Sequence, residues 1–286
     1  MGILERAINA VTGKADPAAN AAAAHARGLS REEVERRLAG NGDRSLSRLD
    51  LTGADLSGMD LEGVDLSGAQ LRNVNLTGAN LSGANLTSAC LCNTDLGRAR
   101  LANAVLRDAS SVRTGALSPM KLEGADLSGA DLTGAELTKA NLRGATFAGA
   151  VLDEAGMGHA DLRGARLQGA SLRGANLRHA QLDEATFSGA VLDTADLTRA
   201  TCRGANFSEA SLVRANLTGT VLEGADLSGA VLREASLDGV VLRGTTLRGA
   251  VFAGADLDGV NLEGADTGGA DFAGAHNWRG ATAASA

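Results

Sequence analysis

The side chains that could do chemistry in this chain are four histidines, three cysteines and many regularly spaced carboxylates. His159 and His179 are 20 residues apart, and Lys139 and Arg199 continue the same spacing on either side. In a fold that stacks residues 20 apart, these four side chains form one column that could bind an anion, or a metal ion through the imidazoles. The alternative is a solvated ladder of side chains without a ligand.

The arrangement of these residues is not typical of an enzyme. No histidine is spaced to pair with a nucleophile, and the glycines recur singly, without a GxGxxG turn that opens a helix. Cys90, Cys92 and Cys202 show neither a CxxC motif nor a Cys/His metal-ligand spacing. We therefore expect no catalytic residue, no cofactor and no metal site.

The cysteines are expected to be reduced thiols, because they are odd in number and show no disulfide framework. Cys90 and Cys92 flank Leu91 and should point outward as inert thiols, whereas Cys202 takes a core position. The chain shows neither a secretion signal nor an apolar stretch near the ~20 residues that span a bilayer. These features predict a cytoplasmic protein that does not bind membranes.

A five-residue repeat must position all of these side chains. From Leu49 the chain reads LDLTG, ADLSG, MDLEG, VDLSG, and similar units continue to residue 272. Each has a small apolar residue, Asp or Asn, a central Leu, a variable polar residue and usually Gly. We number these positions −2, −1, 0, +1 and +2.

The period of five fits neither a helix nor a strand, so the backbone must turn once per unit. Four units close a square coil, and residues 20 apart then stack at the ~4.8 Å spacing of strands. Positions −2 and 0 fill the interior, and Gly suits the corner at +2 because it tolerates positive φ. With 38 Gly, five Phe, one Trp and no Tyr, the composition favours such a thin, repetitive core.

The repeat changes register once. Central residues fall every five positions from 51 to 106 and then from 112 to 272. The single extra residue between Arg107 and Ser111 predicts a bulge and not a projecting loop.

Residues 50–272 resemble the pentapeptide-repeat family, whose consensus is A(D/N)LxG. The resemblance implies an all-β solenoid, a right-handed quadrilateral β-helix of about 11 coils. Some members resemble B-DNA in width and charge, bind DNA gyrase and relieve its poisoning by quinolones. The short register break makes the chain most similar to the loopless, mycobacterial type of these proteins.

Two functions remain open at this point. One is a non-enzymatic scaffold that binds a protein partner through its outer faces or ends. The other is a DNA mimic that binds gyrase, a type II topoisomerase, and gives quinolone-type resistance. The net charge of −7 opposes direct binding of nucleic acid and favours a basic partner if the partner is charged.

The carboxylates that could serve a partner are concentrated at the two ends of the solenoid. Elsewhere, stacked charges alternate in sign, as in the column Arg163, Asp183, Arg203, Glu223, Arg243, Glu263. This alternation dilutes any DNA-like field. The first-coil candidates are Asp50, Asp55, Asp60, Glu62 and Asp65, and those of the last coil are Asp256, Asp258, Asp266 and the neighbouring Glu263 and Asp271.

The segments outside the repeat are expected to be helical at the N-terminus and short at the C-terminus. Residues 1–48 should form helices at 3–11, at 18–26 and after Ser30, where Ser30 and Glu33 make a capping box and Leu29 and Val34 a staple. These helices either cap the solenoid of residues 49–274 or dock elsewhere. The basic side chains of this segment could instead pair with the first-coil acids: Arg36, Arg37, Arg44 and Arg48.

In the C-terminal cap and tail, residues 275–286, Trp278 is expected to plug the last coil. The alternative is that Trp278 anchors a homodimer contact through this end coil.

Overall fold

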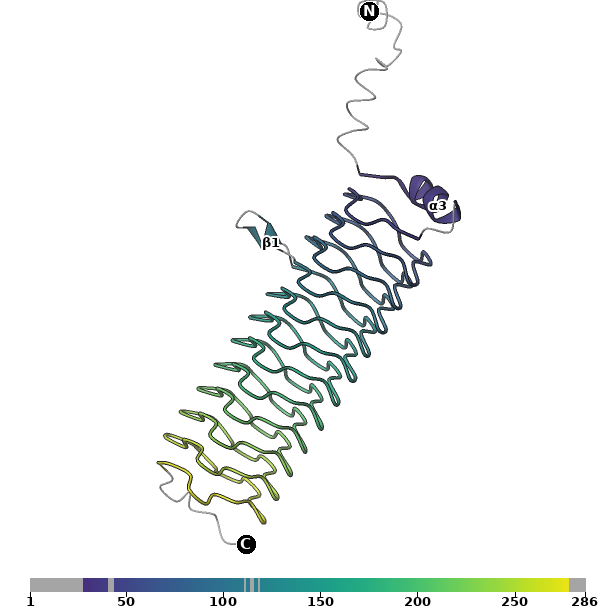
Figure 1. Ribbon diagram of the computed structural model, residues 1–286. Helices are drawn as coiled ribbons and strands as arrows, with labels where there is room; N and C mark the ends of the chain where they lie inside the picture. The colour runs from purple at the N-terminus through teal and green to yellow at the C-terminus, as the bar shows by residue number, and fades with distance from the viewer. Residues whose placement is uncertain (1–27, 41–43, 111, 114–115, 118, 278–286) are drawn as a thin grey trace, which may run out of the picture.

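The protein is described by a computed structural model over residues 28–40, 44–110, 112–113, 116–117 and 119–277. These residues form a rod of stacked coils, with helix α3 (Arg31–Ala39) at one end and a hairpin projecting from the side (Figure 1). Within these ranges no helix is long and apolar enough to cross a bilayer. The helices expected at 3–11 and 18–26, and Trp278, lie outside the described residues.

Residues 20 apart pair in parallel, so four units make one coil. Each unit contributes one bridged residue at position −1, as in the series Asn176, Asp196, Asn216. The N–H of Leu177 donates to the carbonyl of Asp196 over 2.7 Å, and the N–H of Asp196 donates to Ala175 over 2.9 Å. Turns separate successive bridged residues, so the coils contain bridges and hardly any continuous strand.

The core is a filled column of Leu and Ala at positions 0 and −2. Nearly all of these side chains are fully buried from Leu46 to Phe252. Where Phe replaces Leu, the rings stack in register, and those of Phe187 and Phe207 are parallel with centroids 4.7 Å apart. The predicted inward positions are therefore confirmed, and Cys202 is one of them.

The corner at position +2 takes a positive φ along the whole rod. Most corner residues are Gly, for which this conformation costs little, but side chains also occur, as at Lys139 (φ 60°) and Arg199 (φ 56°). A corner side chain points away from the core.

The register break is a β-hairpin, and the prediction of a one-residue bulge is wrong. Strands β1 (Val112–Arg113) and β2 (Ala116–Leu117) pair antiparallel, Val112 with Leu117 and Arg113 with Ala116. Asp95 pairs with Lys121, so the stacked residues are 26 apart here, compared with 20 elsewhere. Six residues are inserted, and a five-residue period cannot distinguish six from one.

The hairpin also changes which positions stack on each other. Val112 and Leu117, expected as central residues, belong to the hairpin, and Met120 and Leu122 resume the buried positions. Residues before and after the hairpin therefore stack one face away from the predicted arrangement. Columns that lie wholly after the hairpin keep the predicted stacking.

The described part of the N-terminal segment packs on the first coil. The predicted capping box of α3 is present, because the Ser30 hydroxyl accepts the Glu33 N–H and the Glu33 carboxylate accepts the Ser30 N–H. Val34 is fully buried, and Leu29 and Leu38 pack against the core. Parallel pairing begins at Ser45, which bridges Asp65.

Candidate partner-binding surfaces

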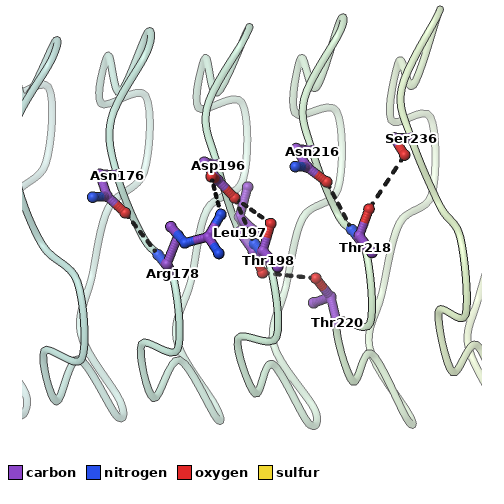
Figure 2. A network of polar contacts seen from close by, with 9 residues as sticks. All are labelled: Asn176, Arg178, Asp196, Leu197, Thr198, Asn216, Thr218, Thr220 and Ser236. Carbon is purple, nitrogen blue, oxygen red and sulfur yellow. Dashed lines mark hydrogen bonds and ion pairs between the residues drawn. The ribbon is translucent and has the colours of Figure 1, made fainter.

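The carboxylates and amides at position −1 are largely engaged by their own unit. The Asp196 Oδ1 accepts the Thr198 N–H over 2.9 Å and its hydroxyl over 2.5 Å, while Arg178 pairs with Oδ2 over 2.9 Å (Figure 2). Asn176 accepts the N–H of Arg178 over 3.1 Å in the same way. The side chain at −1 thus holds the turn at +1, which explains the preference for Asp or Asn there.

These bonds keep several carboxylates ionised and satisfied. The hydrogen bond from Arg163, helped by the Arg163 N–H and the charges of Arg163 and Arg143, lowers the pKa of Asp161 against the opposing effect of burial. Hydrogen bonds from Ser57 likewise lower the pKa of Asp55. A carboxylate bonded in this way supports the fold and contributes less to a field that a partner could sense.

The alternating column is realised as ion pairs in its C-terminal half. Glu223 lies 3.8 Å from Arg203 and 3.7 Å from Arg243, and Arg243 lies 4.0 Å from Glu263. In the other half, Arg163 pairs with Asp161 of its own unit over 2.6 Å. The faces therefore neutralise their own charge.

The first-coil acids are held by amide groups and backbone, and the predicted pairing with the N-terminal arginines is wrong for four of them. Asn80 donates to both Asp60 and Glu62, and Asn85 donates to Asp65. Within the described residues, no ion pair joins Arg36, Arg37, Arg44 or Arg48 to Asp55, Asp60, Glu62 or Asp65.

The polarity of the coil gives the reason. In each unit the carbonyls at −1 and +1 accept bonds from the preceding coil, so in the first coil they face the end of the rod. Leu29 donates its N–H to the carbonyl of Asp50 over 2.8 Å. The guanidinium of Arg31 donates to the Ser57 carbonyl over 2.9 Å, and that of Arg44 to the Asp60 carbonyl over 3.3 Å. These two guanidinium groups satisfy edge carbonyls. Among the described residues neither forms an ion pair with a first-coil carboxylate, although the charge of Arg31 contributes to the lowered pKa of Asp55.

The last-coil acids are also engaged locally. Asp266 forms an ion pair with Arg248 over 2.5 Å, and Asp256 accepts from Asn277 over 2.7 Å. Asp258 lies exposed at position +1 beside Asp256. The two acidic candidate groups are at opposite ends of the rod (Figure 1), so they do not form one site.

The four basic residues 20 apart are brought together as predicted, on one corner. Their N–H groups bond the next coil in turn, Lys139 to Gly158, His159 to Arg178, His179 to Thr198 and Arg199 to Thr218. The rings of His159 and His179 stack with centroids 4.9 Å apart at an angle of 6°. Neither Lys139 nor Arg199 forms an ion pair with a described residue. We call these four residues the corner column.

The hairpin leaves the rod on the same corner. Ser110 bridges Glu136, so the positions after residue 111 stack beneath Thr138 and Lys139. Asn73 and Asn93 hold this corner before the hairpin, where their amides are bonded over 2.8 Å. Along the rod, this corner therefore carries two asparagines, then the projecting hairpin, and then the four residues of the corner column.

Shallow hollows of mixed charge adjoin this corner on the next face. One of about 500 Å³ is lined by residues that include Asp95, Arg98, Lys121 and Arg143. A second, of about 580 Å³, continues along Arg143, Arg163 and Asp183. Within the described chain no cluster of three or more His, Cys, Asp or Glu could hold a metal ion.

Sequence reasoning missed two features of this region. The first is the hairpin, because its six residues shift the five-residue repeat by only one position. The one local signal is the sequence SPM around Pro119, which departs from the consensus. The second feature is the proximity of Cys90 and Cys92, whose sulfur atoms lie 3.0 Å apart. Its signal is their spacing, because positions −1 and +1 are in contact in many other units. The prediction that both cysteines point outward is wrong for Cys92, which is buried.

A family model described as pentapeptide repeats matches most of the chain. The matched segments leave out the hairpin and cover residues 45–83, 79–110, 121–157, 160–199, 195–233, 225–264 and 255–276. No curated protein matches the chain.

Several solved structures are similar to the chain. HetL from Nostoc sp. strain PCC 7120, a pentapeptide repeat protein involved in heterocyst differentiation regulation, is 32% identical over 86% of this chain and 96% of its own, with a TM-score of 0.37. A pentapeptide repeat protein from the Arabidopsis thaliana thylakoid lumen is 34% identical over 34% of this chain and 67% of its own, with a TM-score of 0.33. QnrB1, a plasmid-mediated fluoroquinolone resistance protein, is 17% identical over 76% of this chain and 89% of its own, with a TM-score of 0.39.

Proposed function

Since the chain belongs to the pentapeptide-repeat family, we propose that it is a non-enzymatic scaffold that binds a protein partner along the corner carrying hairpin β1–β2 and the corner column. The partner segment is acidic. The observation that carries this proposal is the position of the hairpin, directly before four stacked basic residues on one corner.

The charge distribution supports the corner over the faces. On the faces, arginines meet carboxylates of the same or the next coil, as Glu223 does with Arg203 and Arg243. On this corner, Lys139 and Arg199 form no ion pair with a described residue, so these two cations at the ends of the column stay available to an acidic segment. The net charge of the whole chain, which favours a basic partner, does not describe this local surface.

The regular shape of the rod supports a binding role in a second way. A coil needs only five-residue units, so the six residues inserted between Ser110 and Met120 exceed what the spacing of the coils requires. Strands β1 and β2 project from the side of the rod (Figure 1), as a recognition element does on a rigid support.

Affinity capture from a cell extract tests this function with three forms of the full chain. The first is the wild type. The second lacks residues 111–116, so that Leu117 takes the central position, and carries Pro119→Gly, because the deletion places residue 119 at a corner whose positive φ proline cannot adopt. It restores the spacing of 20 between stacked coils. The third carries Lys139→Gly and Arg199→Gly.

The matched control is Arg98→Gly, which removes a cation with the same backbone conformation, and without an ion pair to a described residue, from another corner. We expect the wild type and the control to capture a protein from extract that has been treated with nuclease. Both test forms should fail to capture it. Capture of the same proteins by all four forms, or of none by the wild type, would contradict the proposal.

The second candidate is a DNA mimic that binds DNA gyrase. The observation in its favour is the first coil, where Asp60, Glu62 and Asp65 form no ion pair with a described residue. Supercoiling by purified gyrase, with and without ciprofloxacin, separates the candidates. The mimic is favoured if micromolar wild-type protein inhibits supercoiling or protects gyrase from ciprofloxacin, and if Asp60→Asn/Asp65→Asn does neither. If the wild type has no effect on gyrase, the scaffold is favoured.

A further inference from the structure

Two thiols on the rod are placed as a reactive pair. The Sγ atoms of Cys90 and Cys92 lie 3.0 Å apart. This is roughly 1 Å longer than the ~2.05 Å bond of a disulfide. We propose that Cys90 and Cys92 form a reversible intramolecular disulfide when the protein meets a hydroperoxide.

The short distance follows from the fold. The two residues occupy positions −1 and +1 of one unit, and equivalent pairs are in contact along the rod. The Ser82 hydroxyl lies 2.7 Å from Asn80 Oδ1, and that of Ser128 lies 2.7 Å from Asp126 Oδ1. The unit of Cys90 and Cys92 holds two thiols where these units hold a hydrogen-bonded polar pair.

The backbone fixes both residues from the neighbouring coil. The Cys90 N–H donates to Ala69 over 3.0 Å, and its carbonyl accepts from Leu71 over 2.9 Å. The carbonyl of Cys92 accepts from Asn73 over 3.0 Å. The sulfur atoms can therefore approach through small side-chain rotations, without a rearrangement of the coil.

Exposure assigns a role to each sulfur. Cys90 is half-buried and therefore accessible to a small oxidant, whereas Cys92 is only 5% exposed. Redox-sensing cysteines are accessible and lie beside a second cysteine that resolves the oxidised form. Cys90 is the thiol that is attacked first, and Cys92 is the resolving thiol.

The chemistry requires only a hydroperoxide. The Cys90 thiolate attacks one peroxide oxygen, the O–O bond breaks and hydroxide leaves, which gives a sulfenic acid in the case of hydrogen peroxide. The Cys92 thiolate then attacks the Cys90 sulfur, the S–O bond breaks and a second hydroxide leaves. The two thiol protons convert both hydroxides to water, so two thiols and one peroxide give one disulfide and two waters.

The bond should be readily reduced, because it encloses only Leu91 and gains little from loop closure. Cys202 provides an internal comparison. It is fully buried at a central position, and burial, with a smaller contribution from the charge of Asp183, raises the pKa of its thiol far above the usual range. We expect it to stay unmodified while the protein is folded.

The pair also lies beside the candidate recognition element. Cys90 bridges Ser110, the last described residue before the hairpin. Strand β1 begins at Val112, two residues after Ser110. A change in the bonding of the thiols therefore occurs one coil from the base of the hairpin.

The test uses the reduced full-length protein, hydrogen peroxide, alkylation with N-ethylmaleimide after unfolding, and mass spectrometry. Trypsin releases both cysteines in one peptide, residues 73–98, and Cys202 in another, residues 200–203. We expect peptide 73–98 to lose two hydrogens and to resist alkylation, dithiothreitol to reverse both changes, and Cys202 to remain alkylatable.

The variants assign the two roles. Cys92→Ser should accumulate a Cys90 sulfenic acid that dimedone traps, and Cys90→Ser should slow the oxidation of Cys92 at least about tenfold. Cys90→Asn/Cys92→Ser recreates the pair of Asn80 and Ser82, so it serves as the control for folding by circular dichroism. The proposal is overturned if the wild type forms only sulfinic acid or intermolecular bridges, or if both thiols remain alkylatable.

Discussion

Two columns of this rod have the same spacing and opposite consequences. In the alternating column, Glu223 lies between Arg203 and Arg243, so each charge has an opposite neighbour one coil away. In the corner column, the stacked residues are all basic, and neither Lys139 nor Arg199 has an ion-pair partner among the described residues. The residues that stand 20 apart thus decide which charges pair within the fold and which form no ion pair with a described residue.

We expect the largest loss of stability from a substitution in the core, because the same core supports both columns. Phe187→Ala leaves a cavity next to the stacked ring of Phe207 and should lower the free energy of unfolding by about 3–5 kcal/mol. Urea denaturation followed by circular dichroism measures this loss. A loss below about 1 kcal/mol would show that the aromatic stack does not support the coil.

A smaller effect converts the alternating column into a same-sign column. Glu223→Arg places three arginines in succession and should lower the free energy of unfolding by about 1 kcal/mol at low salt, because two exposed ion pairs are replaced by repulsion. Added salt should reduce the difference. Glu209→Arg, which makes the same charge change without breaking an ion pair, is the control and should cost less.

The corner column should behave in the opposite way when a charge is removed. Lys139→Gly relieves a positive φ of 60° and should raise the free energy of unfolding by roughly 0.5–1 kcal/mol. Lys139→Ala removes the same charge and keeps the backbone strain, so it should give no gain. Equal stability of the two variants in urea would mean that the corner costs the fold nothing.

The smallest effect concerns pH. Because the pKa of Asp161 is lowered in the folded state, its contribution is present above the ordinary carboxyl pKa of about 4 and is lost as pH falls through the lower folded value. Asp161→Asn should therefore lose less stability between pH 5 and pH 3 than the wild type. Parallel curves for Asp161→Asn and the wild type would contradict the assignment.

The sequence predicted the rod well because its order is periodic. Repeat position correctly assigned Cys202 to the core and predicted that the four residues of the corner column stack. The motif at Ser30 correctly predicted the capping box. The hairpin was not predicted, because an insertion of six residues shifts a five-residue repeat by one position, as an insertion of one residue does. The roles of Arg31 and Arg44 escaped because the polarity of the coil edge arises from hydrogen-bond direction, which no residue type encodes.

The thiol pair escaped for a related reason. The spacing of Cys90 and Cys92 was visible, but their contact depends on the turn that joins positions −1 and +1. Side chains two apart on an ordinary strand lie on the same face at a larger separation. The distance therefore required the three-dimensional structure of the repeat.

The most direct test of the account is a comparison of two double variants in their binding of one acidic probe, a fluorescent poly-glutamate peptide, at low salt. Lys139→Glu/Arg199→Glu reverses the charge at both ends of the corner column, and Arg203→Glu/Arg243→Glu makes the same charge change in the alternating column. Fluorescence anisotropy should show at least about tenfold weaker binding for the corner variant and about a twofold change or less for the other. Equal losses in both variants, or no binding by the wild type, would contradict the account.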